Sequence, residues 1–246
     1  MRQALLDRLL EAREAKRPVA LVTHLDDGRQ ALLHAEGLQG DLELSAAALA
    51  AAKTALRDDL SGRLPQEAAG DQPLFVQVFN PPLRLIVVGA VHISQALVPM
   101  AQVLGYDVAI IDPRPAFATD QRFPGVWLVD EWPDDAMALL KPDRRTAVVT
   151  LTHDPKLDDP ALSEALKSDS FYIGALGSTR THAKRLERLR AAGLGEAALA
   201  RIQGPAGLAI GAKSPAEIAL SVCAQMTAAL RGAPPLLRAE QAAAAQ

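Results

Sequence analysis

The sequence has a single cysteine, few aromatic residues and no excess of basic charge, and each shortage excludes a class of protein. Cys223 has no second thiol, so neither an intrachain disulfide nor a cysteine-based metal site can form within one chain. Aromatic residues make up 4% of the chain and the net charge is -3. A nucleic acid would therefore find neither a basic surface nor a stacking platform, and we expect no nucleic-acid partner.

Long apolar runs are also missing. Residues 1–30 carry charges throughout, unlike the apolar core of a secretory signal. No apolar run approaches the roughly 20 residues that a membrane-spanning helix needs. We therefore expect no membrane span and a cytoplasmic location. Apolar residues nevertheless make up 49% of the 246 positions, which is typical of a globular chain with a sizeable core.

Residues 1–80 predict a small α+β domain. Leucines at helical spacing and later an alanine-rich run predict two helices, and the Asp-Gly pair at 27–28 predicts a β-hairpin. Glycines at 37 and 40 interrupt the chain, and a Gly/Pro-rich stretch predicts a loop or linker before a last strand. These segments are, in order, the helix 2–16, the hairpin strands 19–23 and 30–34, the helix 46–60, the loop 61–73 and the strand 75–79.

From residue 81 onward, short apolar runs alternate with helical patterns. The runs are typical of strands buried on both faces, and they cover 84–89, 108–112, 126–129, 147–151 and 171–176. Helices are predicted over 92–104, 132–140, 159–167, 179–192 and 214–230. The alternation predicts an α/β fold, a Rossmann-like, doubly wound parallel sheet over 81–232. Residues 233–246 predict a flexible tail.

In such a sheet, ligands bind beyond the carboxyl ends of the strands. The first of these turns is Gly89, Ala90, Val91 and His92, and it opens a helix whose free amides attract an anion. The turn has only the first glycine of a G-x-G-x-x-G dinucleotide fingerprint, and the side chain of Val91 would crowd a diphosphate. We place a Rossmann topology without a nicotinamide cofactor ahead of an NAD enzyme, and both remain open.

Polar residues also follow the next strands. Asp112 stands where a Rossmann acid would bind ribose hydroxyls, and the alternative is an ion pair with Arg114 inside a rigid loop. Thr152, His153 and Asp154 offer three groups that can exchange protons or contact an anion. The alternative for Asp154 is helix capping.

The strongest local signal follows the strand at 171–176. Gly174 and Gly177 permit close backbone approach, and Ser178 caps a helix that carries Arg180. The helix dipole and the basic residues of this helix, which also include His182, Lys184 and Arg185, would together attract negative charge. The alternative is a solvated, charged helix face. Asp158 and its neighbours read as the start of a helix rather than as a metal site, and we predict neither metal ligands nor catalytic residues.

Several segments together resemble the XdhC/CoxI family of accessory proteins of molybdenum hydroxylases. They occur in order between residues 83 and 230, and they are Leu85-Ile-Val-Val-Gly-Ala-Val-His-Ile, Ile111-Asp-Pro-Arg-Pro-Ala-Phe-Ala, Leu151-Thr-His-Asp-Pro-Lys-Leu-Asp-Asp-Pro-Ala-Leu, Phe171-Tyr-Ile-Gly-Ala-Leu-Gly-Ser and Gly204-Pro-Ala-Gly-Leu-Ala-Ile-Gly-Ala-Lys-Ser-Pro. The resemblance implies a Rossmann-like carboxy-terminal domain behind a smaller amino-terminal one.

The resemblance also implies a chaperone-like maturation factor. Such a protein binds molybdenum cofactor (molybdopterin), protects it during sulfuration and delivers it to an apo-enzyme of the xanthine dehydrogenase or carbon monoxide dehydrogenase type. Partners implied in this way are the apo-enzyme and either a cysteine desulfurase or a full-length family member. A homodimer would cover exposed strand edges. The competing hypothesis is an NAD(P)-dependent oxidoreductase with a degenerate fingerprint.

The chain departs from the family pattern in two places. Val91 replaces the second glycine of the usual Gly-Ala-Gly-His turn. The amino-terminal domain is shorter, and a Gly-Cys-Val-Glu-like segment corresponds to residues 37–43, which contain no cysteine. The chain thus resembles a family member with a short amino-terminal domain. Such a protein would have a narrower task, or it would work together with a complete family member. We expect the cofactor's own dithiolene to remain the principal molybdenum ligand.

Overall fold

The structure is a computed structural model of the chain and describes residues 3–70 and 72–233. The chain divides into two compact units at the junction of Pro81 and Pro82. The expected tail, residues 233–246, lies outside the described residues except for Ala233. Within the described ranges, no helix is both long and apolar enough to cross a membrane.

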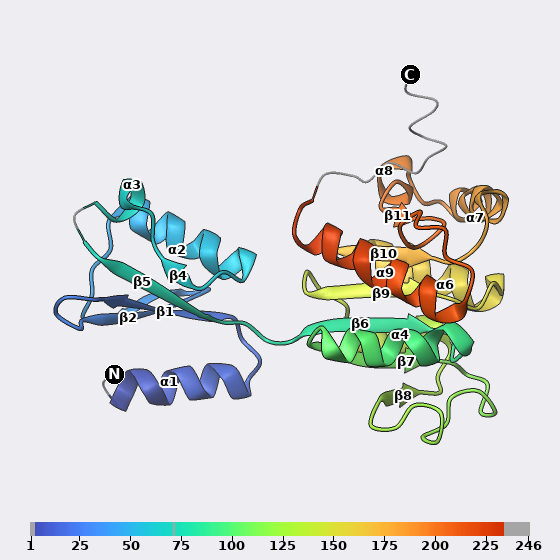
Figure 1. Cartoon of the computed structure of the whole chain (residues 1–246), viewed down its shortest axis with the longest axis horizontal. Helices are drawn as coiled ribbons and strands as arrows, with labels where there is room; N and C mark the ends of the chain where they lie inside the picture. Colours follow the sequence, from blue (N-terminus) through green and yellow to red (C-terminus); the bar gives the residue numbers. More distant parts are fainter. Residues whose placement is uncertain (1–2, 71, 234–246) are drawn as a thin grey trace. The chain divides into compact units, whose positions relative to one another are not determined.

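The first unit is built on an antiparallel sheet of strand order β3-β2-β1-β5-β4 (Figure 1). Its strands are β1 (Val19–His24), β2 (Gln30–His34), β3 (Gly37–Gly40), β4 (Gly62–Arg63) and β5 (Leu74–Phe79). Its helices are α1 (Gln3–Glu14), α2 (Ala46–Asp58) and α3 (Gln66–Ala69). Alternate residues of β1 point to opposite faces, so Leu21 packs against α1 while Val22 joins the core beneath α2.

Two expectations for this unit were wrong. The glycines that were expected to interrupt the chain at 37 and 40 instead begin and end β3, and both have positive φ angles, 144° and 151°, that residues with a side chain rarely adopt. At Gly40 a Cβ would collide with the backbone of Gln30 on the neighbouring strand, so only glycine fits there. The expected loop 61–73 contains β4 and α3, and β4 pairs with β5 at the sheet edge.

The second unit contains a parallel sheet of strand order β11-β10-β9-β6-β7-β8. Its strands are β6 (Leu83–Val88), β7 (Tyr106–Ile111), β8 (Trp127–Val129), β9 (Thr146–Thr150), β10 (Tyr172–Ala175) and β11 (Ile202–Gln203). Its helices are α4 (His92–Val103), α5 (Pro133–Leu140), α6 (Pro155–Lys167), α7 (Thr179–Ala191), α8 (Glu196–Leu199) and α9 (Pro215–Leu230). The α/β class and the parallel sheet are therefore as predicted, whereas α8 and β11 were not foreseen.

Helices cover both faces of the parallel sheet. On β6, Leu85 and Val87 pack beneath α4 and α9, which lie side by side (Figure 1). The intervening Ile86 and Val88 join the opposite core, which α5 and α6 cover. Since the residues from Leu85 to Val88 are all buried, an unbroken apolar run marks this part of β6 in the sequence.

Capping residues set the starts of two helices. At α9, Ser214 accepts a hydrogen bond from the Glu217 amide, and the Glu217 carboxylate accepts one from the Ser214 amide. At α6, Asp154 accepts a hydrogen bond from the Lys156 amide, and Pro155 occupies the first turn. The expected start of α6 at residue 159 was therefore wrong by one turn.

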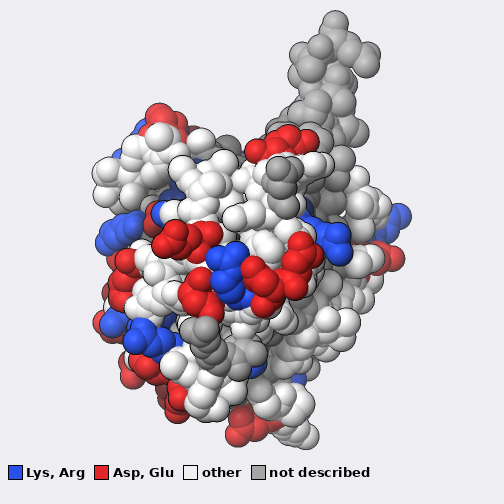
Figure 2. Space-filling model, turned by 90° about the vertical axis from the view of Figure 1, so that its left-hand side faces the viewer, with Lys and Arg blue, Asp and Glu red and all other residues white. Residues whose placement is uncertain are grey.

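Charged side chains are mixed over the surface. Figure 2, which views the side at the left of Figure 1, shows acidic and basic residues interspersed among uncharged ones. This distribution agrees with the near-balance of 26 basic and 29 acidic residues in the whole sequence.

Burial of Cys223 in α9 predicts an unreactive thiol. The side chain lies in the core between α9 and the sheet, and burial raises its pKa to about 11. At pH 8 we expect the folded protein to react with iodoacetamide about 100-fold more slowly than the protein unfolded in guanidinium, because the thiolate is the nucleophile. Mass spectrometry of timed samples measures both rates. Equal rates in the two states would contradict the burial of Cys223.

Candidate functional site

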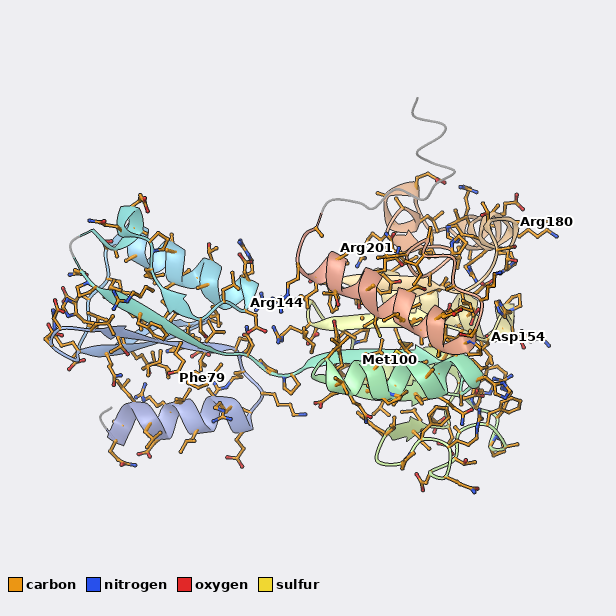
Figure 3. The ribbon with its side chains drawn as sticks, in the orientation of Figure 1. Phe79, Met100, Arg144, Asp154, Arg180 and Arg201 are labelled. Atoms are coloured by element: carbon orange, nitrogen blue, oxygen red, sulfur yellow. The ribbon has the colours of Figure 1, made fainter. Side chains whose placement is uncertain are left out.

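The candidate site lies at the carboxyl edge of the parallel sheet. In the strand order, β7 and β9 lie on either side of β6. The chain therefore adds strands on one side of β6 first and on the other side afterwards, and ligands of such sheets bind where this change of side occurs. The loops after β6, β7, β9 and β10 therefore meet at this edge. Asp154 and Arg180 lie at the end of the unit toward which β6 points (Figure 3).

The backbone amides of the β6–α4 turn are hydrogen-bonded within the protein. Gly89 has a φ of 110°, and a Cβ there would lie 2.6 Å from Thr152 Cγ2, so the turn requires glycine. The Ala90 amide donates to Asp112 Oδ2 at 2.8 Å, and the Val91 amide donates to Ser94 Oγ at 3.3 Å. Two amides that a pyrophosphate would need in a dinucleotide site are thus already bound.

Asp112 forms an internal ion pair. Its carboxylate is fully buried and accepts hydrogen bonds from the Arg114 amide and from both Nε and Nη2 of Arg114, the latter two at 2.7 Å. Burial alone raises the pKa of Asp112, but the hydrogen bonds from Arg114 and Ala90 outweigh it and hold the pKa below its usual value. The carboxylate has no acceptor site left for ribose hydroxyls.

The loop between β7 and β8 is tied onto this turn. The Arg114 guanidinium lies 4.2 Å from the ring centre of Phe117. Arg122 donates to the carbonyl oxygens of Ala90 and Phe117 and to Gln95 Oε1 of α4. The first turn of α4 is therefore bordered by a loop whose side chains are already engaged, although the His92 side chain remains exposed.

A hollow of about 160 Å³ lies between the starts of α6 and α7, and we name it the α6–α7 hollow. His153 contributes from the loop after β9, where its φ of 63° places it in the left-handed region. Ser178 caps α7, because its hydroxyl oxygen accepts a hydrogen bond from the Thr181 amide. The lining residues are His153, Pro155, Asp158, Arg180, Thr181, Lys184, Arg185 and Arg188.

A buried ion pair forms part of the hollow's wall. Asp158 and Arg185 are each 1% exposed, and Asp158 Oδ2 lies 3.6 Å from Arg185 Nη2. Thr152 Oγ1 donates to Asp158 Oδ1 at 2.6 Å, and Arg185 Nη2 donates to the Leu176 carbonyl at 2.7 Å. Burial raises the pKa of Asp158 and lowers that of Arg185, because it disfavours both charged forms.

This pair leaves polar atoms open. Within the described residues, Asp158 Oδ2 and the Nε and Nη1 atoms of Arg185 have no hydrogen-bond partner. Buried polar groups of folded proteins are almost always hydrogen-bonded, so these three atoms are an unused hydrogen-bonding capacity beside the hollow.

The structure brings together only some of the predicted site residues. His153 and Arg180 line one hollow, as expected, whereas Asp112 is not among its lining residues. Gly174 lies inside β10, where a Cβ would meet the Tyr172 ring at 2.7 Å, so its role is to admit that side chain. At Gly177 a Cβ would meet Thr181 at 3.1 Å.

Sequence reasoning missed the role of Asp158, and it counted Arg185 among the cations of its helix without foreseeing its burial beside Asp158. Asp158 was read only as a helix start, yet its side chain lies beside the hollow. A signal was available on α7, because Arg180, Lys184 and Arg188 repeat every four residues and therefore share one face of the helix. No cluster of His, Cys, Asp or Glu suited to a metal ion occurs in the described part of the chain.

Helices on both faces of a parallel sheet, with polar loops gathered at its carboxyl edge, define a Rossmann-like ligand-binding domain. Residues 85–226 match the XdhC Rossmann domain, and the chain belongs to this family, as the resemblance predicted. A protein of Bacillus halodurans whose crystal structure is described as that of a xanthine dehydrogenase has the same fold. It superposes with a TM-score of 0.72 at 23% identity, over 93% of this chain and 67% of that one.

Two curated relatives carry informative names. The molybdenum cofactor insertion chaperone PaoD of Escherichia coli is 34% identical over 148 residues, which are 60% of this chain and 40% of PaoD. A Bacillus subtilis protein, named as a probable component of xanthine dehydrogenase, is 32% identical over 154 residues, 62% of this chain and 44% of that protein. The matches span less than half the length of both relatives.

The Asp112–Arg114 pair predicts a pH-dependent contribution to stability. Asp112→Asn removes the charge that holds Arg114, and we expect a loss of about 1–3 kcal/mol at pH 7, because Arg114 can still reach solvent. The folded protein lowers the pKa of Asp112 from 3.8, so the contribution is present above about pH 4 and is lost as the pH falls further. Urea unfolding followed by the fluorescence of Trp127 and Trp132 measures it.

The matched control is Asp120→Asn, an exposed carboxylate of the same loop. We expect its free energy of unfolding to stay within about 0.5 kcal/mol of the wild-type value. A difference between wild type and Asp112→Asn that is as large at pH 3 as at pH 7 would contradict the role given to the ion pair.

Proposed function

We propose that this chain binds molybdenum cofactor and helps to insert it into a molybdenum hydroxylase of the xanthine dehydrogenase or carbon monoxide dehydrogenase type. The observation that carries the proposal is the α6–α7 hollow, a cationic site at the ligand-binding edge of an XdhC Rossmann domain. The name of PaoD, a molybdenum cofactor insertion chaperone, supports the choice of ligand.

The residues at this edge suit a phosphorylated pterin. The hollow, at about 160 Å³, is smaller than the roughly 300–1,000 Å³ of sites that enclose a whole organic ligand. We therefore assign the phosphate end of the cofactor to the hollow and the heterocycle to the more open edge outside it. There, the exposed side chain of His153, at the border of the hollow, offers hydrogen-bonding groups.

The chain's only thiol does not serve the molybdenum. Cys223 is buried in the core beneath α9, and its raised pKa keeps it protonated. We therefore propose that the cofactor keeps its own dithiolene as the main ligand of the metal. In this proposal the protein's part is to bind, orient and shield the cofactor until the apo-enzyme accepts it.

The proposed partner is the apo-form of a molybdenum hydroxylase. The name of the Bacillus subtilis relative supports an association with xanthine dehydrogenase. A cysteine desulfurase or a longer family member, working on the bound cofactor, and a homodimer of this chain remain proposals of the same kind.

Binding of molybdenum cofactor tests the proposal. We expect the purified chain to bind cofactor released from a molybdoenzyme, and Arg180→Ala or His153→Ala to raise the Kd about threefold to tenfold, since each removes a hydrogen bond to a charged group. Fluorescence of the pterin measures the Kd. Arg190→Ala is the control, because Arg190 lies on α7 but outside the hollow, paired with Glu196.

Two outcomes would contradict the proposal. Absence of binding by the wild-type chain would remove the assigned function. Unchanged affinity in both the Arg180 and His153 variants would leave the function standing but place its site elsewhere.

The competing NAD(P) hypothesis makes a separate prediction. The Asp112 acceptors and two amides of the β6–α4 turn are bound within the chain, so we expect no heat of binding when NAD(H) or NADP(H) is titrated up to millimolar concentration. A micromolar Kd for either nucleotide would favour the oxidoreductase instead.

A further inference from the structure

We propose that the α6–α7 hollow is a phosphate-monoester site in its own right, in which Arg185 and Asp158 distinguish phosphate from other oxyanions. The inference deepens the proposed function and rests on it only for the identity of the natural ligand. Nothing in the fold of the domain requires such a site, since the usual phosphate position of a Rossmann domain is the β6–α4 turn.

Charge is the first argument. Arg188 is already neutralised, because its Nε and Nη2 atoms donate to both oxygens of Asp159 at 2.6 and 2.9 Å. Arg180 and Lys184 are exposed and have no ion-pair partner within the described residues. The hollow therefore has two uncompensated cations at its mouth, which attract a dianion.

Hydrogen-bonding capacity is the second argument. The Nε and Nη1 atoms of Arg185 lack acceptors within the described ranges, although the side chain is almost fully buried, with a relative exposure of 2%. Leaving buried donors unpaired costs about 1–3 kcal/mol for each group. These two donors lie on different edges of the guanidinium, so a bound phosphate would accept a charge-assisted hydrogen bond from one of them, Nε or Nη1.

Size is the third argument. A volume of about 160 Å³ equals the share of about five water molecules in the liquid. This space takes a phosphate group and the first atoms of its ester, and not a dinucleotide. The amino-terminal turns of α6 and α7, both helices of 13 residues, border the hollow, and the positive ends of their dipoles favour an anion there.

Asp158 supplies selectivity. Its Oδ2 atom is an acceptor without a hydrogen-bond donor within the described residues, and it lies beside Arg185. A ligand that satisfies this atom must therefore donate a hydrogen bond to it. A phosphate monoester carries one proton on part of its population near neutral pH, whereas sulfate carries none. Sulfate would place an unprotonated oxygen against the carboxylate, and the site should therefore prefer phosphate.

Inorganic phosphate is the probe for the experiment. We expect titration of the full chain with phosphate to give saturable heat, and a thermal midpoint that rises with phosphate concentration. Sulfate at the same ionic strength should bind at least about tenfold more weakly. Arg180→Ala and Lys184→Ala should each weaken phosphate binding about threefold, and the double variant about tenfold.

A third variant tests the buried donor. Arg185→Lys keeps the charge but removes the fixed guanidinium donors Nε and Nη1, and we expect it to weaken phosphate binding more than about tenfold. Circular dichroism checks that this variant folds, and the Arg180 and Lys184 variants test the site even if it does not. Arg190→Ala should bind phosphate as the wild type does.

The outcomes separate this inference from the proposed function. Absence of saturable phosphate binding, or equal binding by wild type and the double variant, would overturn the phosphate site even if molybdenum cofactor binds. Equal affinity for phosphate and sulfate would overturn the role of Asp158. Phosphate binding that depends on Arg180 and Lys184, in a chain that does not bind the cofactor, would support the site and remove the proposed function.

Discussion

The ion pair between Asp158 and Arg185 is the interaction on which the arrangement of the site depends. It joins the first turn of α6 to the second turn of α7, and both side chains are almost fully buried. Removing one partner of such a pair typically costs about 3–5 kcal/mol, because the other charge stays buried. The pair thus holds the two helix starts at a fixed distance.

The same pair is connected to the turn after β6. Thr152 donates its hydroxyl hydrogen to Asp158, and its methyl group occupies the space beside Gly89 that a side chain would otherwise take. A side chain at position 89 would therefore displace Thr152 and disturb the carboxylate. Close packing of this kind makes the turn, the loop after β9 and the two helices one unit.

The two halves of the carboxyl edge have opposite characters. On the β7 side, Asp112 and Arg114 bind each other and Asp112 also binds the Ala90 amide, so the region that would hold a dinucleotide is filled by the chain. On the β10 side, the open atoms of Arg185 and the exposed cations of α7 leave capacity for a ligand. In the proposed phosphate site, the domain keeps its Rossmann topology while the anion binds at α7 and not at the β6–α4 turn.

Much of the fold could be predicted from the sequence, and the site only in part. Short apolar runs identified β6, β7 and β9, because the parts of a strand that are buried on both faces are mostly apolar. Weak elements such as β4 and β11 escaped prediction, since two-residue strands are stabilised by their neighbours and not by their own composition. Arg180 and His153 stood out because they follow strand ends, whereas Arg185 looked like one more charge on a polar helix.

The sequence by itself determined the alternation of strands and helices, the family, and the edge of the sheet at which polar groups gather, because these follow from local patterns and the geometry of parallel sheets. Only the tertiary structure decided which polar residues bind each other and which keep unpaired atoms. Asp112 and Asp158 look alike in the sequence, but one has all its acceptor sites filled by Arg114 and Ala90 and the other retains an open oxygen. That difference depends on distances between segments far apart in the chain, which no local pattern contains.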